Sequence, residues 1–234
     1  MTRLADRLTG RTRRYLIGVA ALCCLAVLTA LLIANGLPAR PPQTAATPPA
    51  ELHDLDEAML IDESAVPPLA GTTWGSIVAI PRGAEPQVSP AECVVFLSQG
   101  PAAEKGLAMR SSKNASIGVS LSLGGQRPDL SALLAECTVF TFNGAGASSR
   151  VELKPMPLDG LPDGAVSTLL HCRTARAGET LVWDIALIVG YHRGVLVSAQ
   201  YTPGPQGGPF DAQLASGLGD VYRAQIDKLD HWVP

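Results

Sequence analysis

Residues 180–202 read TLVWDIALIVGYHRGVLVSAQYT and contain the strongest strand signal of the chain. Apolar side chains recur at every second position on both sides of a short polar break, which is the period of a half-buried β-strand. The pattern predicts a β-hairpin whose three-residue loop, Tyr191–Arg193, lies between Gly190 and Gly194. A loop of that length would put the odd-numbered apolar residues of both strands on one face. These residues are Leu181, Trp183, Ile185, Leu187 and Val189 on the first strand, and Val195, Val197, Ala199 and Tyr201 on the second.

Four more strands are predicted outside this hairpin. Residues 117–123 alternate apolar side chains with Gly and Ser and end at a Gly-Gly pair. Residues 137–142 and 150–154 flank a glycine-containing turn and form a second predicted hairpin, and residues 167–176 form a further strand. Because neighbours in sequence usually pair, we expect an antiparallel sheet of about six strands.

Three helices accompany the predicted sheet. Ser89–Gly100 begins with a Ser cap, a Pro and a Glu three residues after the cap, which is typical of a helix start. Asp129–Glu136 is a short helix candidate, and Pro209–Trp232 contains an apolar stripe with a period near 3.6 residues. The fold class is therefore α+β, with helices packed on one face of the sheet and the other face left for solvent or a ligand.

The first 35 residues predict a membrane anchor. Residues 1–14 contain five arginines and one acid, and the following Leu16–Ala34 is a run of 19 almost uninterrupted apolar residues. A helix of that length is about 28 Å long, close to the roughly 30 Å of a bilayer's hydrocarbon core. We expect residues 1–14 in the cytoplasm, residues 15–35 across the membrane, and the remainder outside the cell. A cleavable signal peptide is the alternative, because Ala34 and Gly36 resemble a cleavage site.

The segments after the predicted span differ in composition. Residues 36–50 contain five prolines, which favour an extended stalk. Residues 51–66 contain six acids and no base, with Leu52, Leu55 and Met59 at helical spacing. We expect a short amphipathic helix that packs on the domain, and the alternative is an acidic segment that docks a partner. Residues 51–234 form the predicted extracytoplasmic α+β domain.

Composition and motifs exclude several classes of function. The chain is 47% hydrophobic, which excludes a mainly disordered protein, and its net charge of −3 with a basic N-terminus leaves an acidic domain unsuited to nucleic acid. No nucleophile motif, dinucleotide fingerprint or metal-binding motif is present, so we expect neither an enzyme nor a bound cofactor or metal. His171 and His192 could still meet on neighbouring strands. The four histidines are otherwise scattered: His53, His171, His192 and His231.

Three cysteines follow the predicted span, and an exported chain favours a disulfide over a metal site. We favour a bridge between Cys93 and Cys137, which are 44 residues apart. In the chain-entropy model such a bridge contributes about 3 to 4 kcal/mol. A bridge between Cys137 and Cys172 is the alternative, and other pairings or none remain open.

Two short stretches resemble exported sensor-type domains of mycobacteria. They are Leu55–Asp62 (LDEAMLID), followed by Gly71, and Val88–Cys93 (VSPAEC). This family includes the extracellular domain of a mycobacterial membrane Ser/Thr kinase, its lipoprotein relatives and related uncharacterised envelope proteins. The resemblance, over residues 51–234, implies an α+β domain with a sheet-side cleft for an extracytoplasmic ligand. This chain has no kinase domain and too few cysteines for the two disulfides of the kinase's sensor, so neither bridges nor ligand site carry over.

The sequence thus predicts a single-pass membrane protein whose external domain binds or senses a ligand of the cell envelope. The alternative is a non-catalytic accessory or structural partner of an envelope protein complex. A binding domain would have a concave, partly apolar pocket, whereas an accessory partner would expose an apolar patch.

Overall fold

The computed structural model describes most of the predicted external domain. The described residues are 50–62, 74–79, 87–97, 103–111, 115–123, 126–144, 147–176, 178–203 and 210–232, all within one compact unit, Pro49–Pro234. The predicted tail, membrane span and all but the last residue of the stalk lie outside them. Among the helices in these ranges, none is long and apolar enough to cross a membrane.

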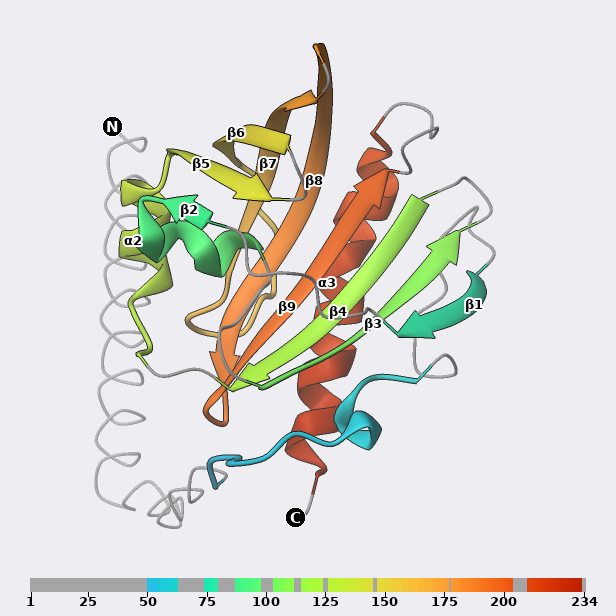
Figure 1. Ribbon diagram of the computed structural model, residues 1–234. Coiled ribbons are helices and arrows are strands. Elements are labelled where there is room, and N and C mark those ends of the chain that lie inside the picture. The colour runs from blue at the N-terminus through green and yellow to red at the C-terminus, as the bar shows by residue number, and fades with distance from the viewer. Residues whose placement is uncertain are drawn as a thin grey trace, which may run out of the picture. The chain divides into compact units, whose positions relative to one another are not determined.

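Nine strands of the described ranges form one curled antiparallel sheet in the order β1-β3-β4-β9-β8-β7-β6-β5-β2 (Figure 1). Their bounds are β1 Trp74–Ala79, β2 Gln87–Ser89, β3 Ala103–Ser111, β4 Ala115–Leu123, β5 Val139–Gly144, β6 Ala147–Pro155, β7 Val166–Arg176, β8 Glu179–His192 and β9 Val195–Pro203. The six predicted strands are present, and β1, β2 and β3 were missed. β2 has only three residues, and β3 reads AEKGLAMRS, without apolar alternation.

Two α-helices and two 3₁₀ helices complete the described fold. Their bounds are η1 Glu57–Met59, η3 Ala91–Leu97, α2 Leu130–Glu136 and α3 Ala212–Asp230. Each α-helix begins after an aspartate whose carboxylate accepts hydrogen bonds from two backbone N–H groups of the first turn, Asp129 for α2 and Asp211 for α3. The α+β class and both of these helices are confirmed.

The predicted helix Ser89–Gly100 is wrong in its start and type. Ser89 belongs to β2 and pairs with Thr141 of β5, so its backbone is part of the sheet and does not cap a helix. The helix that follows is the 3₁₀ helix η3, and residues 98–100 of the prediction lie outside the described residues.

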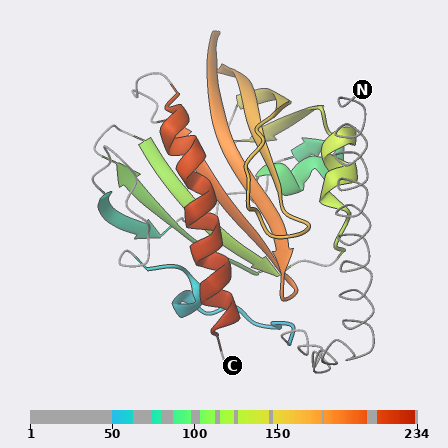
Figure 2. The same ribbon diagram turned by 180° about the vertical axis from the view of Figure 1, so that it is seen from behind.

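The helices cover both faces of the sheet, so the prediction of helices on one face is wrong. Helix α3 packs against β4, β8 and β9 on one face, as Figure 2 shows. On the other face, α2 and η3 pack with β5, β6 and β7 around Phe96, Phe140 and Val151. The sheet is therefore the middle layer of the domain, between two hydrophobic cores.

Strand β8 contributes to both cores. Ala186 and Ile188 are buried in the core under α3, whereas Leu187 and Val189 are buried in the core beside α2 and η3. Burying each of the larger side chains contributes about 1.5–3 kcal/mol. The middle of β8 is thus apolar at consecutive positions because each face of the strand meets a different core.

The hairpin between β8 and β9 has a shorter loop than predicted. Its turn consists of Arg193 and Gly194, both with positive φ (47° and 85°), and His192 pairs with Val195. Positive φ at both central positions is the feature of a type I′ turn. This register aligns odd positions of β8 with even positions of β9, so the predicted shared odd face is wrong. Alternation could not reveal the register, because both faces of β8 are apolar there.

Residues 50–62 run mostly extended and attach to the fold at several points, so the predicted helix is wrong except for the single turn η1. Leu52, Leu55 and Met59 are buried, as expected for a segment that packs on the domain. The buried amide of Gln225 on α3 accepts a hydrogen bond from the Ile61 N–H and donates one to the Met59 carbonyl, each 2.8 Å long.

Arg193 links the start of residues 50–62 to the C-terminal end of α3 through hydrogen bonds. Its carbonyl accepts a 2.8 Å hydrogen bond from the Leu52 N–H, and its Nε donates a 2.8 Å hydrogen bond to the Ala50 carbonyl. Its Nη1 also donates to the Trp232 carbonyl over 2.9 Å. These bonds explain how a non-glycine residue is held at positive φ in the turn. The two ends of the described domain therefore lie together, beside the β8–β9 turn (Figure 1).

We expect Gly190→Ala to lower the free energy of unfolding by about 1–3 kcal/mol, because an overpacked core strains its neighbours. A methyl group at Gly190 would clash with the Tyr222 hydroxyl of α3 and come within 2.9 Å of the Ala165 Cβ. Thermal unfolding of residues 49–234 measures the loss.

Gly219→Ala in α3 is the matched control, since its methyl group would lie 3.4 Å from the flexible Arg223 Nη1. There Ala should preserve stability or add about 0.5–1 kcal/mol, because Gly is the poorer helix former. Equal stability of both variants would contradict the close approach of β8 and α3.

Candidate functional site

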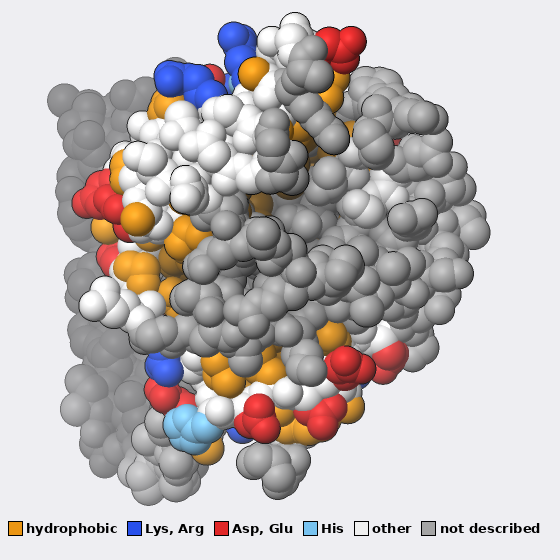
Figure 3. All heavy atoms as spheres, viewed as in Figure 1, with side chains coloured by type: hydrophobic (Ala, Val, Ile, Leu, Met, Phe, Trp, Pro, Cys, Tyr) orange, Lys and Arg blue, Asp and Glu red, His pale blue; other side chains and the backbone are white. Residues whose placement is uncertain are grey.

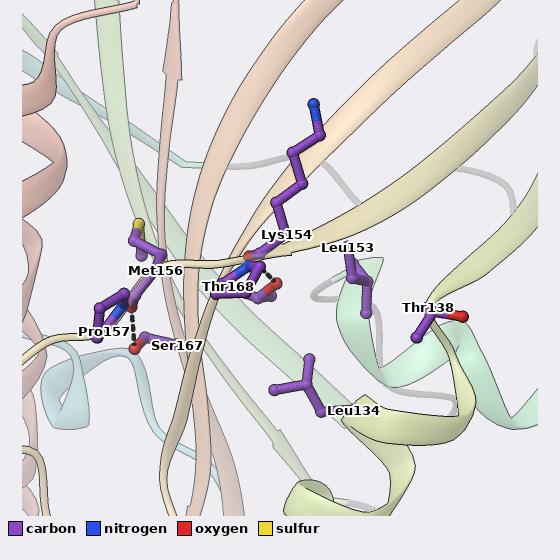
Figure 4. A pocket seen from close by; sticks show the side chains of 9 residues that line it. Leu134, Thr138, Leu153, Lys154, Met156, Pro157, Ser167 and Thr168 are labelled. Carbon is purple, nitrogen blue, oxygen red and sulfur yellow. Dashed lines mark hydrogen bonds between the residues drawn. The ribbon is translucent and has the colours of Figure 1, made fainter.

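A pocket of about 400 Å³ lies where β6 ends, between α2, β6 and β7 (Figure 4). This volume falls within the range of about 300–1,000 Å³ that is usual for small-molecule sites. The lining residues are Leu134, Thr138, Leu153, Lys154, Pro155, Met156, Pro157, Ser167 and Thr168.

The sequence around Pro155 explains why space opens here. Pro155 is the last residue of β6 and pairs with Thr168 of β7. Proline has no backbone N–H to donate to a ladder, so strands commonly end at it. A second proline, Pro157, follows closely, and the chain then runs beside α3, where Arg223 donates a hydrogen bond to the Gly160 carbonyl.

The pocket presents mainly apolar groups. Figure 4 shows the side chains of Leu134 and Leu153 pointing toward each other across it, whereas the Met156 side chain points away from both and packs against the core under α3. The Ser167 hydroxyl donates a hydrogen bond of 2.6 Å to the Met156 carbonyl, and the Thr168 hydroxyl donates one of 3.0 Å to the Lys154 carbonyl. Both hydroxyl groups therefore already donate their protons to backbone carbonyls. Toward a ligand, each hydroxyl oxygen can act only as a hydrogen-bond acceptor.

Lys154 supplies the charge at the rim of the pocket. Its side chain extends away from the apolar lining groups in Figure 4. No carboxylate of the described residues lies within ion-pair distance of its ammonium group. Of the described residues that line the pocket, none is a carboxylate, a histidine or a cysteine. The arrangement can hold an apolar group with an anionic end.

The histidines predicted as a minor alternative do not meet. His171 Nδ1 lies 2.7 Å from Asp184 Oδ1 across β7 and β8, and His192 Nε2 lies 2.7 Å from Asp230 Oδ1 of α3. His171 pairs with Asp184, eight residues from His192 along β8, which is a separation of about 26 Å. Within the described ranges, no three potential metal ligands gather.

The cysteine prediction is confirmed. Cys93 of η3 and Cys137, directly after α2, form a disulfide with a Cα–Cα distance of 5.7 Å. Cys172 is free and buried in β7, so the alternative bridge is absent. Burial in the apolar core, with a smaller effect of the Asp184 charge, raises the pKa of the Cys172 thiol to about 12. Such a thiol remains protonated at neutral pH and is a poor nucleophile.

Sequence reasoning missed the pocket residues. The run Pro155-Met156-Pro157, directly after a predicted strand, was the available signal, because prolines end a strand and leave its neighbours uncovered. Leu134 gave no signal, since it enters the pocket only through the packing of α2 on the sheet.

The comparisons with known proteins show a weak structural likeness. No protein-family profile matches the chain, and no curated protein sequence matches it. The chain is similar in structure to an uncharacterised protein of Mycobacterium smegmatis, an ortholog of Rv0999, with a TM-score of 0.40 and 17% sequence identity. That likeness covers 70% of this chain and 92% of the other.

We expect the Cys93→Ala, Cys137→Ala double variant to lose about 4 kcal/mol of unfolding free energy, because its unfolded chain is no longer constrained across 44 residues. Urea unfolding of residues 49–234, with and without reductant, measures this loss. Reductant should destabilise the unsubstituted domain and leave the double variant unchanged. Equal stability of the oxidised and reduced domain would contradict a structural role for the bridge.

Proposed function

We propose that this chain is a membrane-anchored binding protein whose external domain holds an amphipathic molecule of the cell envelope in the pocket beside Pro155. The single observation that carries the proposal is an apolar pocket of about 400 Å³ with Lys154 at its rim, where no carboxylate of the described residues pairs with the ammonium group. Apolar walls with few polar groups are typical of small-molecule sites.

The ligand chemistry follows from the lining. Leu134 and Leu153 would contact an alkyl chain, which gains about 25 cal/mol for each Å² removed from water. Lys154 would pair with an anionic head at the rim. The resemblance of Leu55–Asp62 and Val88–Cys93 to exported sensor-type domains supports a ligand outside the cell.

Decanoate and decan-1-ol are suitable probes, because they share the alkyl chain and differ in charge. The domain Pro49–Pro234 can be tested alone, since the residues of both cores lie within it. Leu134→Trp should fill the pocket and weaken both probes about tenfold or more. Lys154→Gln should weaken decanoate alone, by roughly two- to five-fold, because an exposed ion pair contributes about 0.2–1 kcal/mol.

Ala135→Trp is the matched control for this experiment, because Ala135 is exposed on the same helix. It should leave the affinity for both probes unchanged, as measured by calorimetry or thermal shift. Binding that persists at full strength in Leu134→Trp would place the ligand elsewhere. The absence of binding by either probe would reject an alkyl-chain ligand.

The proposed membrane topology can be tested in a separate experiment. Protease added to intact cells should digest residues 51–234, whereas a cytoplasmic marker protein stays whole, because the arginines of residues 1–14 favour a cytoplasmic N-terminus. Protection of the domain until the cells are lysed would overturn the proposed topology. The mass of the purified chain distinguishes an uncleaved anchor from a cleaved signal peptide.

A non-catalytic role in an envelope protein complex is the second candidate function. The observation that favours it is the exposure of Leu181 and Val182 on β8, because exposed large apolar groups mark interaction sites. A screen in which envelope lipids and glycans fail to stabilise the domain, with a protein partner recovered by crosslinking, would favour this role.

A further inference from the structure

Strand β8 is longer than its neighbour β9, which leaves part of one edge open. The ladder between them begins at Ala186, paired with Tyr201, and runs to His192. Continued by two residues, the same register would place Pro203, the last residue of β9, opposite Asp184. Residues Glu179–Trp183, here called the free edge, therefore pair on one side only, with β7, among the described residues.

The free edge has exposed backbone groups that can pair. Residues beside a two-residue turn exchange hydrogen bonds, so His192 and the other even positions of β8 direct their backbone groups toward β9. On the free edge the even positions are Thr180 and Val182. Their N–H and C=O groups point away from β7, and no other strand of the described residues pairs with them.

Exposed apolar side chains accompany these backbone groups. Leu181 is 48% exposed and Val182 54% exposed, and their side chains lie on opposite faces of the sheet. Figure 1 shows this part of β8 projecting beyond β9 at one end of the domain, and Figure 3 shows hydrophobic, basic and acidic side chains together at that tip. A strand that is open at its edge and apolar on both faces is a template for pairing.

The two outer strands of the sheet, β1 and β2, do not offer a long and regular edge of this kind. β2 is only three residues long, and β1 has a register shift between Trp74 and Ile77. Short strands and bulges are the features by which proteins protect an edge. The free edge has neither, since its register with β7 runs without interruption from Val166–Val189 to Arg176–Glu179.

We propose that two copies of this chain pair antiparallel through their free edges, with a two-fold axis at Leu181. Leu181 is the midpoint of Glu179–Trp183, so this register uses the whole free edge without meeting β9. It places Leu181 opposite its symmetry mate, Thr180 opposite Val182, and Glu179 opposite Trp183. The backbone groups of Thr180 and Val182 then face each other, as an antiparallel ladder requires.

The positions of the acids are compatible with a second copy as the occupant. The acids at the ends of this stretch, Glu179 and Asp184, occupy an odd and an even position, so their side chains lie on opposite faces. In antiparallel self-pairing, odd positions meet odd ones and even positions meet even ones, so these two acids are never opposed. Self-complementarity of this kind is the condition for a two-fold interface.

Five paired residues per chain make a small contact compared with standard interfaces of about 1,200–2,000 Å². The dimer is therefore a concentration-dependent equilibrium. Anchoring two chains in one membrane raises their effective concentration, and this point rests on the proposed anchor, as does the membrane setting of the crosslinking experiment.

Cysteine crosslinking of the full chain in membranes tests the axis. With Leu181 on the axis, Leu181→Cys places two Cα atoms about 4.5 Å apart, within disulfide range. Val182→Cys is the matched control, because its two Cα atoms would be about 8 Å apart, beyond that range. We expect an oxidant to give a covalent dimer of Leu181→Cys well above the level of Val182→Cys and of the unsubstituted chain.

Sedimentation velocity of residues 49–234 over a concentration series tests the equilibrium. Leu181→Lys should weaken association about tenfold or more, because it opposes two like charges at the axis. Val139→Lys should leave association unchanged, since Val139 is 37% exposed but lies on β5 away from the free edge.

Three results would overturn the proposal. The first is a monomer at every concentration, with no Leu181→Cys crosslink above background, which would leave the edge to a different partner chain. The second is a dimer that Leu181→Lys does not affect, which would place the interface elsewhere. The third is a Val182→Cys crosslink stronger than that of Leu181→Cys, which would contradict the axis.

Discussion

The burial of β8 on both faces is the constraint on which the rest of the domain depends. Ile188 lies under α3 while the adjacent Leu187 and Val189 lie in the core beside α2 and η3. A strand so placed must have neighbours on both edges, and β7 and β9 provide them along its second half. Beyond its ladder with β9, the same strand continues with one edge that no described strand pairs, and Leu181 and Val182 are exposed there. The two cores, the order of the central strands and the free edge are thus consequences of one long strand.

Hydrogen bonds hold the two ends of the described chain together at one end of the domain. Arg193, in the tight turn after β8, binds the carbonyl groups of Ala50 and Trp232, which belong to opposite ends of the described chain. Gln225 of α3 binds the same N-terminal segment. Its buried amide accepts a hydrogen bond from the Ile61 N–H and donates one to the Met59 carbonyl. A buried amide is stable only when its donor and acceptor are both satisfied, so these contacts determine the path of residues 50–62. The free edge of β8 lies at the other end, away from these attachments.

The two α-helices were predicted correctly, α3 from its apolar stripe. The helix start at Ser89 was wrong although its local signal was strong, because Ser89 pairs with β5 in the sheet. The strands with clear alternation were also found, as was the disulfide between Cys93 and Cys137, although that pairing was one of several. The pocket was not predicted, because Leu134, Leu153 and Thr168 come together only when α2 packs on the sheet. The prolines after β6 were its one local sign.

The sequence by itself determined the α+β class, six of the strands, both α-helices and the acidic, apolar-rich character of the domain. These properties depend on composition and on apolar periodicity, which is set by residues a few positions apart. Only the tertiary structure decided the register of the β8–β9 hairpin, the placement of helices on both faces and the position of the free edge. A period-two pattern identifies a face only when the opposite face is polar, and in β8 both faces are apolar because each one meets its own core.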